Sequence, residues 1–173
     1  MQERIHAWKL PCEDDPLRLG PVALLGMVFV SLTRLRVRSV RFLPLFAWHA
    51  LRSNAQVKRA PGFLHGALLP DRERTFWTMT VWESQEAMRG YMLAGDHKKA
   101  MPHLMEWCDE ASVAHWEQED AALPSWEEAD RRMRASGRAS KVRHPSEGQA
   151  GAAHAGLAYR EPRTTGGAPI RRR

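Results

Sequence analysis

The chain has 173 residues and a formal net charge of +6, which suits one domain with a sizeable core. The charge is unevenly placed: residues 127–173 hold 11 Lys and Arg against 5 Asp and Glu, so the first 126 residues are neutral. The basic charge therefore belongs to a tail and not to a folded face, which argues against nucleic acid as a partner.

Cysteine use and hydropathy indicate the compartment. The two cysteines, Cys12 and Cys108, supply neither a disulfide framework nor a metal-binding motif, and such sparse use is typical of a reducing cytoplasm. The apolar run 22–32 is too short to span a bilayer, and acidic residues 13–15 precede it where a signal peptide would be basic. We therefore expect a cytoplasmic protein with no membrane span and no metal site.

The first predicted strand follows an N-terminal arm, residues 1–20, that has no sustained hydrophobic period. Residues 24–37 are rich in β-formers and free of proline, which predicts a strand. In its later half Arg34, Arg36 and Arg38 alternate with Thr33, Leu35 and Val37. This alternation predicts one apolar and one solvated face.

A helix, two strands and a turn are predicted next. Residues 39–59 are predicted to be helical because four apolar residues recur at near-helical spacing, namely Leu45, Trp48, Leu51 and Ala55. Pro61-Gly62 ends this helix. Residues 63–69 and 75–82 are predicted strands joined by a turn at 70–73.

The second half contains two further helical segments and the last strand of the domain. Ser84 is a suitable N-cap for a helix that runs through Tyr91 and breaks near Gly95. A second helical piece follows, and residues 111–116 form the last strand. Residues 125–135 are a short charged helix, and the basic tail that follows has almost no large apolar residue, which predicts disorder.

The predicted order β-α-β-β-α-β is that of an α+β, ferredoxin-like domain over residues 21–120, with a four-stranded antiparallel sheet. Residues 121–136 would add the short C-terminal helix and residues 137–173 the disordered basic tail. Both helices of such a domain lie on one face of the sheet, so its other face is bare. An apolar bare face needs a cover, and face-to-face pairing of two sheets predicts a homodimer, a dimeric α/β barrel.

The third strand and following helix carry a resemblance. Residues 81–88 read Val-Trp-Glu-Ser-Gln-Glu-Ala-Met, with His97 nine residues further on, and residues 60–63 read Ala-Pro-Gly-Phe. On these residues the chain resembles the antibiotic biosynthesis monooxygenase-like superfamily of dimeric α/β barrels, over about residues 24–116. The segment 107–112, Trp-Cys-Asp-Glu-Ala-Ser, further resembles its spheroidene-monooxygenase-like branch.

The resemblance implies the function. The superfamily includes cofactor-independent oxygenases of aromatic polyketides, haem-degrading enzymes and proteins with no known reaction. It implies a monooxygenase-like oxidoreductase that acts on a small hydrophobic or aromatic molecule. No motif here requires a cofactor, and haem is the one cofactor that the resemblance suggests. The alternative, from another class, is a non-catalytic dimeric ligand-binding or structural protein on the same scaffold.

Four residues are the candidate site. His97 lies at a helix break and is a candidate general base, or else a helix-capping or surface residue. His115 is a candidate second base or haem ligand, or else a packed residue of the dimer face. Trp77 and Trp82 point to opposite faces of one strand, so one of them should face the cavity and donate its indole N–H to an oxyanion. Otherwise both belong to the core.

The remaining chemistry-bearing residues predict no site. His103 is six residues from His97, a spacing that does not give the pair of a helical zinc site. The isolated His49 and His65 are interpreted as structural or surface residues. Asp109 and Glu110 should diverge in an extended strand, and Cys108 is interpreted as an inert core thiol.

Overall fold

The structure is a computed structural model that describes residues 26–163 and 167–172. The predicted N-terminal arm lies outside these residues. The strands are β1 Val28–Val37, β2 Phe63–Pro70, β3 Thr75–Trp82, β4 Cys108–Gln118, β5 Arg138–Ala139 and β6 Ala168–Arg171. The helices are α1 Leu43–Val57, α2 Gln85–Met92, α3 Gly95–Trp107, α4 Trp126–Ser136 and α5 Glu147–Ala155, with 3-10 turns at Val40–Phe42 and Arg72–Arg74.

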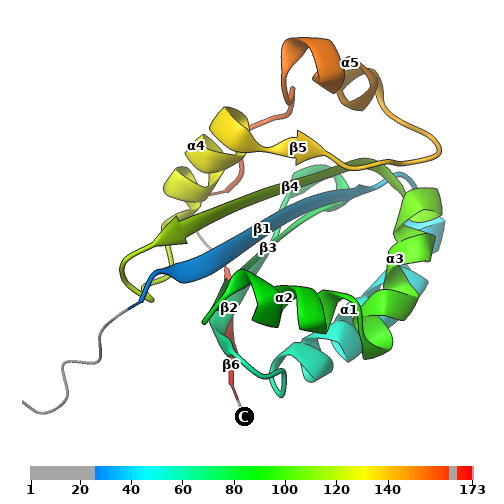
Figure 1. Ribbon diagram of the computed structural model, residues 1–173. Coiled ribbons are helices and arrows are strands. Elements are labelled where there is room, and N and C mark those ends of the chain that lie inside the picture. Colours follow the sequence, from blue (N-terminus) through cyan, green and yellow to red (C-terminus); the bar gives the residue numbers. More distant parts are fainter. Residues whose placement is uncertain (1–25, 164–166, 173) are drawn as a thin grey trace, which may run out of the picture.

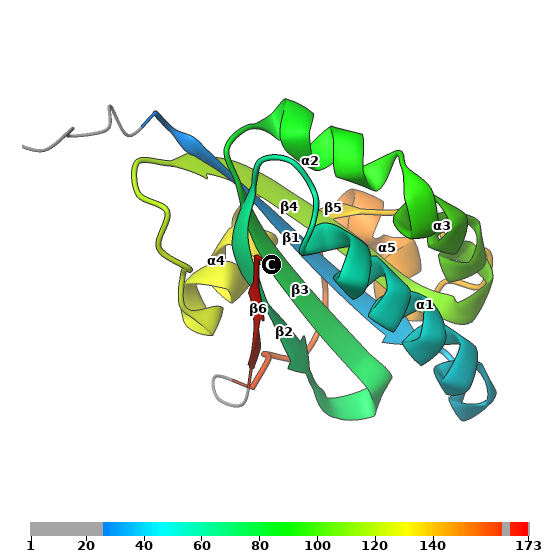
Figure 2. The same cartoon turned by 90° about the horizontal axis from the view of Figure 1, so that it is seen from below.

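The ferredoxin-like order is confirmed. The strands β4-β1-β3-β2 lie side by side and every pairing is antiparallel. Helices α1, α2 and α3 lie on one face of this sheet (Figures 1 and 2). The predicted N-cap is also present, because the Ser84 side chain accepts a hydrogen bond from the Ala87 N–H. No helix among the described residues is both long and apolar enough to cross a membrane.

The predicted number of strands is wrong: the sheet has six strands instead of four. The two additional strands come from the tail predicted to be disordered, with β5 on the β4 edge and β6 on the β2 edge. The composition of the tail predicted disorder because the tail has few large apolar residues. An edge strand, however, forms mainly through backbone hydrogen bonds to the unpaired groups of the neighbouring strand. The few large apolar residues of the tail are also used, and Ile170 is only 3% exposed.

The second face of the sheet is covered by the C-terminal part of the same chain. Helices α4 and α5 lie on the face opposite α1–α3 (Figure 1). Trp126, Ala129 and Met133 form an apolar stripe at i, i+3 and i+7 on α4 and pack with buried residues of β1, β3 and β4. The bare face from which a homodimer was predicted is therefore not bare in the described residues, and that argument for a dimer no longer applies.

Helix α1 is rotated relative to the expectation from its apolar spacing. Leu45, Trp48 and Leu51 are 54%, 58% and 67% exposed. The side that faces the sheet is offset by about one residue and includes Phe46 and Val57, which are buried. Phe46 meets Phe76 of β3 with 4.7 Å between ring centroids. The apolar period identified the helix, but the contact with β3 decided which side is buried.

Candidate functional site

A line of aromatic rings joins the end of β3 to the start of α3. Trp82 is fully buried, and its ring lies 5.3 Å from that of Tyr91 on α2. The Tyr91 ring in turn lies 4.7 Å from the His97 ring. Two of the four predicted site residues, Trp82 and His97, are therefore brought together through Tyr91, which the sequence did not single out.

His97 is held at the junction of α2 and α3. Its backbone N–H donates to Gln56 Oε1 at 2.9 Å, and its Nδ1 lies 3.2 Å from the Met92 carbonyl oxygen. A carbonyl oxygen can only accept, so this contact assigns the proton to Nδ1 and leaves Nε2 as the basic nitrogen. Burial lowers the pKa of His97, an effect that the Met92 hydrogen bond partly offsets. The ring is therefore neutral at neutral pH, as a general base must be.

His115 lies on the same side of the sheet, on β4. Its ring is 5.3 Å from that of Phe29, and Phe29 is the cross-strand partner of Trp82. Partial burial lowers the pKa of His115, and the positive charge of Arg138 lowers it further. His115 therefore belongs to the side of the sheet that faces α1–α3, together with Trp82.

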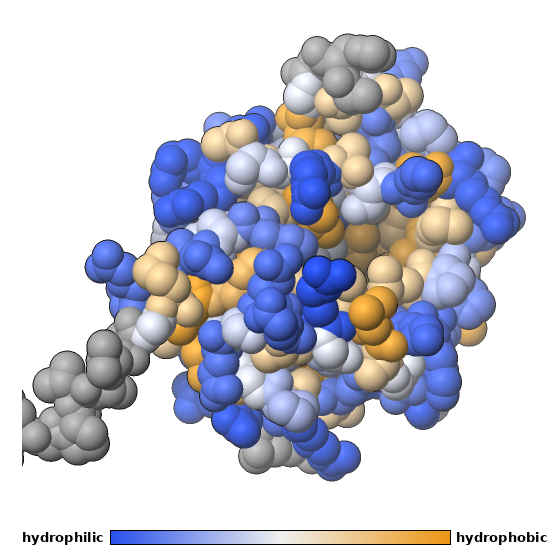
Figure 3. Space-filling view, viewed as in Figure 1, coloured by the Kyte–Doolittle hydropathy of each residue, from blue (hydrophilic) through white to orange (hydrophobic). Residues whose placement is uncertain are grey.

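A row of small polar side chains continues from His115 across the sheet. Ser31 pairs with both His115 and Thr80 in the strand register, and the next row pairs Thr33 with Thr78. Thr33, Thr78 and His115 are only half-buried, so the helices do not fully close over this part of the sheet. Apolar side chains gather in the space between the strands and α3, inside a largely hydrophilic outer surface (Figure 3).

The two candidate tryptophans differ in their environment. Trp77 faces the C-terminal segment; its Nε1–H donates to Asp71 Oδ2 at 3.3 Å and its ring packs on Tyr159. Trp82 faces α1 and α2, and its Nε1 has no hydrogen-bond partner among the described residues, although it is buried. The structure thus separates Trp77 from the other three candidates.

An open pocket of about 540 Å³ lies beside His97, between α1 and the α2–α3 junction. Tyr91, Gln56 and Asp96 line it, but His97 itself does not. A second cavity, on the opposite face of the sheet, has no histidine in its lining either. Neither of these two linings therefore supplies a histidine ligand for the haem that the resemblance suggested.

A second histidine cluster joins α1 and α3. The His103 ring stacks on Trp107 at 4.9 Å, and the His49 ring lies 5.2 Å from His103. His49 is therefore not isolated, which the sequence could not show because the two helices are far apart along the chain. In residues 26–163 and 167–172, no group of three or more His, Cys, Asp or Glu side chains could hold a metal ion.

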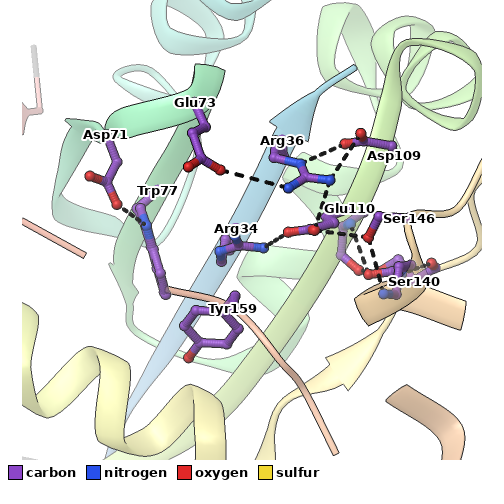
Figure 4. Close-up of polar contacts among 12 residues, drawn as sticks. Arg34, Arg36, Asp71, Glu73, Trp77, Asp109, Glu110, Ser140, Ser146 and Tyr159 are labelled. Carbon is purple, nitrogen blue, oxygen red and sulfur yellow. Dashed lines mark hydrogen bonds and ion pairs between the residues drawn. The ribbon is translucent and has the colours of Figure 1, made fainter. Parts of the chain in front are cut away.

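Charged residues were missed on the face covered by the C-terminal segment. Arg34 was predicted to be solvated, but it is 5% exposed and its Nη1 donates to Glu110 Oε2 at 2.7 Å. Arg36 pairs with both Asp109 and Glu110 at 2.9 Å, and Ser146 of the α5 N-terminus also donates to Glu110 (Figure 4). All of these residues except Asp109 line a cavity of about 390 Å³.

Asp109 and Glu110 do not diverge as predicted. The register between β1 and β4 shifts between Arg36 and Val37, where a β-bulge lies on β4. A bulge places two consecutive residues opposite one on the partner strand, and both carboxylates therefore reach Arg36. The signal was present in the sequence as alternating arginines and a pair of acids, but it becomes informative only once β1 and β4 are known to be neighbours.

A family model described as a domain of unknown function (DUF3291) matches residues 44–141. Among curated proteins, none matches the chain by sequence.

Several solved structures are similar in fold. One is a conserved protein from Methanosarcina mazei Go1, with 11% identity, a TM-score of 0.47 and coverage of 52% of this chain and 91% of that chain. A Nitrosomonas europaea protein provisionally described as an antibiotic biosynthesis monooxygenase has 13% identity, a TM-score of 0.45 and coverage of 57% and 92%. SnoaB, a cofactor-independent oxygenase from Streptomyces nogalater, has 17% identity, a TM-score of 0.42 and coverage of 56% and 95%.

Antibiotic biosynthesis monooxygenase-like proteins, to which the sequence was found similar, are thus among the matched structures. Nothing in these matches bears on the spheroidene-monooxygenase-like branch. At these identities the matches concern the fold alone, and they assign no activity to this chain.

Proposed function

The chain belongs to the family described as a domain of unknown function (DUF3291), and from that premise we propose that it is a monooxygenase-like oxidoreductase for a small hydrophobic or aromatic molecule. The observation that carries the proposal is the buried indole N–H of Trp82, which has no acceptor among the described residues. An unpaired buried donor costs about 1–3 kcal/mol, and an oxygen atom of a bound molecule would remove this cost.

In this proposal His97 and Trp82 act on one substrate. The unprotonated Nε2 of His97 takes a proton from an acidic C–H of the substrate, and the Trp82 N–H donates to the oxyanion that results. Tyr91 touches both rings, so in this proposal a flat substrate that binds both groups lies beside Tyr91. His115 is the second candidate base.

Dioxygen is the oxidant of this reaction. The substrate carbanion passes electrons to O₂, so that a CH₂ group and O₂ become a carbonyl group and water. One oxygen atom enters the product and the other leaves as water, so the chemistry needs no cofactor.

A non-catalytic ligand-binding protein is the second candidate. It is favoured by one observation, namely that the pocket beside His97 and the cavity on the opposite face of the sheet both lack His97, Trp82 and His115 in their linings. Binding of a hydrophobic molecule without oxygen consumption would support this candidate.

Mass spectrometry of the native protein tests whether a molecule is bound at Trp82. We expect a small hydrophobic molecule to copurify with the wild type, and Trp82→Phe to weaken its binding about 10-fold or more because the indole donor is lost. Trp77→Phe on the opposite face is the matched control and should retain the molecule. Equal retention by both variants would remove Trp82 from the site. A Soret band in the purified protein would indicate haem.

Oxygen consumption with the copurified molecule tests the reaction. Loss of the base is expected to lower the rate by about 10²–10⁴-fold, so His97→Gln should be that much slower than the wild type. His103→Gln, which alters the surface of α3, should leave the rate unchanged. If His97→Gln keeps the full rate and His115→Gln loses it, the base is His115; full rates in both would contradict the proposed reaction.

A further inference from the structure

The charged cavity on the opposite face of the sheet is independent of the proposed oxygenase site. It is bordered by β1 and β4, by the turn between β2 and β3, and by the segment around α5 and Tyr159 (Figure 4). Its volume of about 390 Å³ is within the range of small-molecule sites, about 300–1,000 Å³. Most of its lining residues are charged, so a ligand must carry charges that complement them.

Arg34 lines this cavity and keeps one N–H group without a partner among the described residues. Its Nη1 is engaged by Glu110, and its guanidinium carbon lies 4.4 Å from the centre of the Tyr159 ring. Its Nε has no partner among the described residues although the side chain is buried. The Nε–H is parallel to one N–H of Nη2, and this pair is the fork that grips a carboxylate in bidentate fashion. A buried charged donor left unpaired is rare in proteins.

The charges of the lining restrict what this fork can hold. Four arginines and five carboxylates line the cavity, a net charge of −1. A simple anion would satisfy Arg34 but would add to the negative excess, whereas a simple cation would leave the fork empty. Three of the carboxylates, Glu73, Glu147 and Glu161, are exposed at the rim and can face a positive group of a ligand. Glu73 also lies 3.9 Å from Arg36.

We propose that this cavity binds a zwitterionic small molecule of the amino-acid type. Its carboxylate pairs with Nε and Nη2 of Arg34, its ammonium group faces the rim carboxylates, and its side chain lies against Tyr159. At the cavity mouth Glu73 has a left-handed backbone conformation (φ 55°) that non-glycine residues seldom adopt. Such strained residues often occur at functional sites.

Isothermal titration with three probes that share one body tests the charge requirement. L-phenylalanine carries both charges, 3-phenylpropanoate only the carboxylate and 2-phenylethylamine only the ammonium group. We expect L-phenylalanine to bind at least about 10-fold more tightly than either single-charge probe, about 1.4 kcal/mol. Binding of either single-charge probe as tight as that of L-phenylalanine, or no binding by any of the three, overturns the proposal.

A pair of variants tests the role of Arg34. Arg34→Lys keeps the positive charge beside Glu110 but lacks the fork, so L-phenylalanine should bind about 10-fold or more weakly. Arg38→Lys is the matched control directly after the same strand, because Arg38 pairs with Glu106 outside the cavity, and its affinity should equal that of the wild type. Equal affinity in Arg34→Lys overturns the assignment.

The wild type provides a second readout in case Arg34→Lys fails to fold. The Nε–H resonance of Arg34 in a nitrogen-15 NMR spectrum should shift when L-phenylalanine is added, because the new hydrogen bond forms at that atom. The Arg38→Lys spectrum identifies the resonance of the neighbouring arginine. An unchanged Arg34 resonance at saturating probe overturns the proposal.

Discussion

His97 and His115 are two histidines whose pKa is lowered by the fold, chiefly through burial. A folded-state pKa below the ordinary value of 6.5 means that the unfolded chain binds more protons in the range just below 6.5. Stability therefore rises with pH in that range and levels off above it. The acids with lowered pKa, Glu106 and Glu128, act on stability only nearer 4.5, so the two effects can be separated.

The lowered pKa of His97 predicts that the stability of the fold depends on pH, in part through this residue. We expect the free energy of unfolding in urea to fall between about pH 7 and pH 5, and His97→Gln to reduce that fall because its side chain does not titrate. His103→Gln, a change of an exposed histidine, is the matched control. A pH profile that is identical in His97→Gln and wild type would contradict the lowered pKa.

Trp77 and Trp82, the two fully buried tryptophans of β3, should differ in how much stability is lost when the indole N–H is removed. Trp77→Phe removes a hydrogen bond to Asp71, whereas Trp82→Phe removes a donor that has no partner. The loss of volume is similar in both, so Trp77→Phe should destabilise by about 1 kcal/mol more. Urea denaturation at pH 7.5 measures the difference. An equal or larger cost for Trp82→Phe in the ligand-free protein would indicate that its N–H has an acceptor.

The junction between α1 and β2 depends on Gly62. Its φ is 72°, and a Cβ there would lie 2.5 Å from the Ala87 Cβ. The backbone of this turn therefore passes against the first turn of α2, and Glu83 N–H donates to the Gly62 carbonyl at 2.8 Å. The Pro-Gly pair thus positions α2, and with it Tyr91 and the aromatic line to His97.

This contact predicts that Gly62→Ala destabilises by about 1–3 kcal/mol, through positive φ and the clash with Ala87. Gly90→Ala within α2 is the control: a Cβ there meets nothing within 4 Å, and alanine stabilises a helix interior by about 0.5–1 kcal/mol relative to glycine. Thermal unfolding of both variants should show shifts of opposite sign. A neutral Gly62→Ala would show that the turn can move away from α2.

The C-terminal third of the chain covers the sheet. It buries the apolar face through α4 and protects both edges through β5 and β6. The His65 Nε2 atom is hydrogen-bonded to the Ala121 carbonyl oxygen. The Gln149 side chain accepts a hydrogen bond from the Ala111 N–H and donates one to the Ala111 carbonyl oxygen. The chain thus does internally what a second copy was predicted to do.

The oligomeric state follows from this cover. Because the apolar sheet face is already buried, we expect sedimentation equilibrium to give the mass of one chain, 19.7 kDa, at micromolar concentration. Met133→Asp places a charge at a fully buried contact between α4 and the sheet and should favour association by exposing that face. A wild-type mass of two chains that does not change on dilution would instead support the homodimer predicted from the sequence.

Local pattern alone determined most elements of the ferredoxin-like core. The alternation of Thr75 to Trp82 predicted β3 to the residue, and Ser84 and Gly95 marked the starts of α2 and α3. These features depend on side-chain period and capping, which act over a few residues. The sequence likewise placed Trp77 and Trp82 on opposite faces, as the two clusters of buried residues confirm.

Which faces are buried, and by which segments, depends on contacts between parts of the chain that are distant in sequence. Arg34 became a buried ion-pair residue because β4 lies beside β1 and the tail returns over both. The outward side of α1 and the pairing of Arg36 with two successive acids likewise depend on contacts between segments far apart in the chain. Such contacts follow from strand order, a bulge and chain return, none of which a local hydrophobic period encodes.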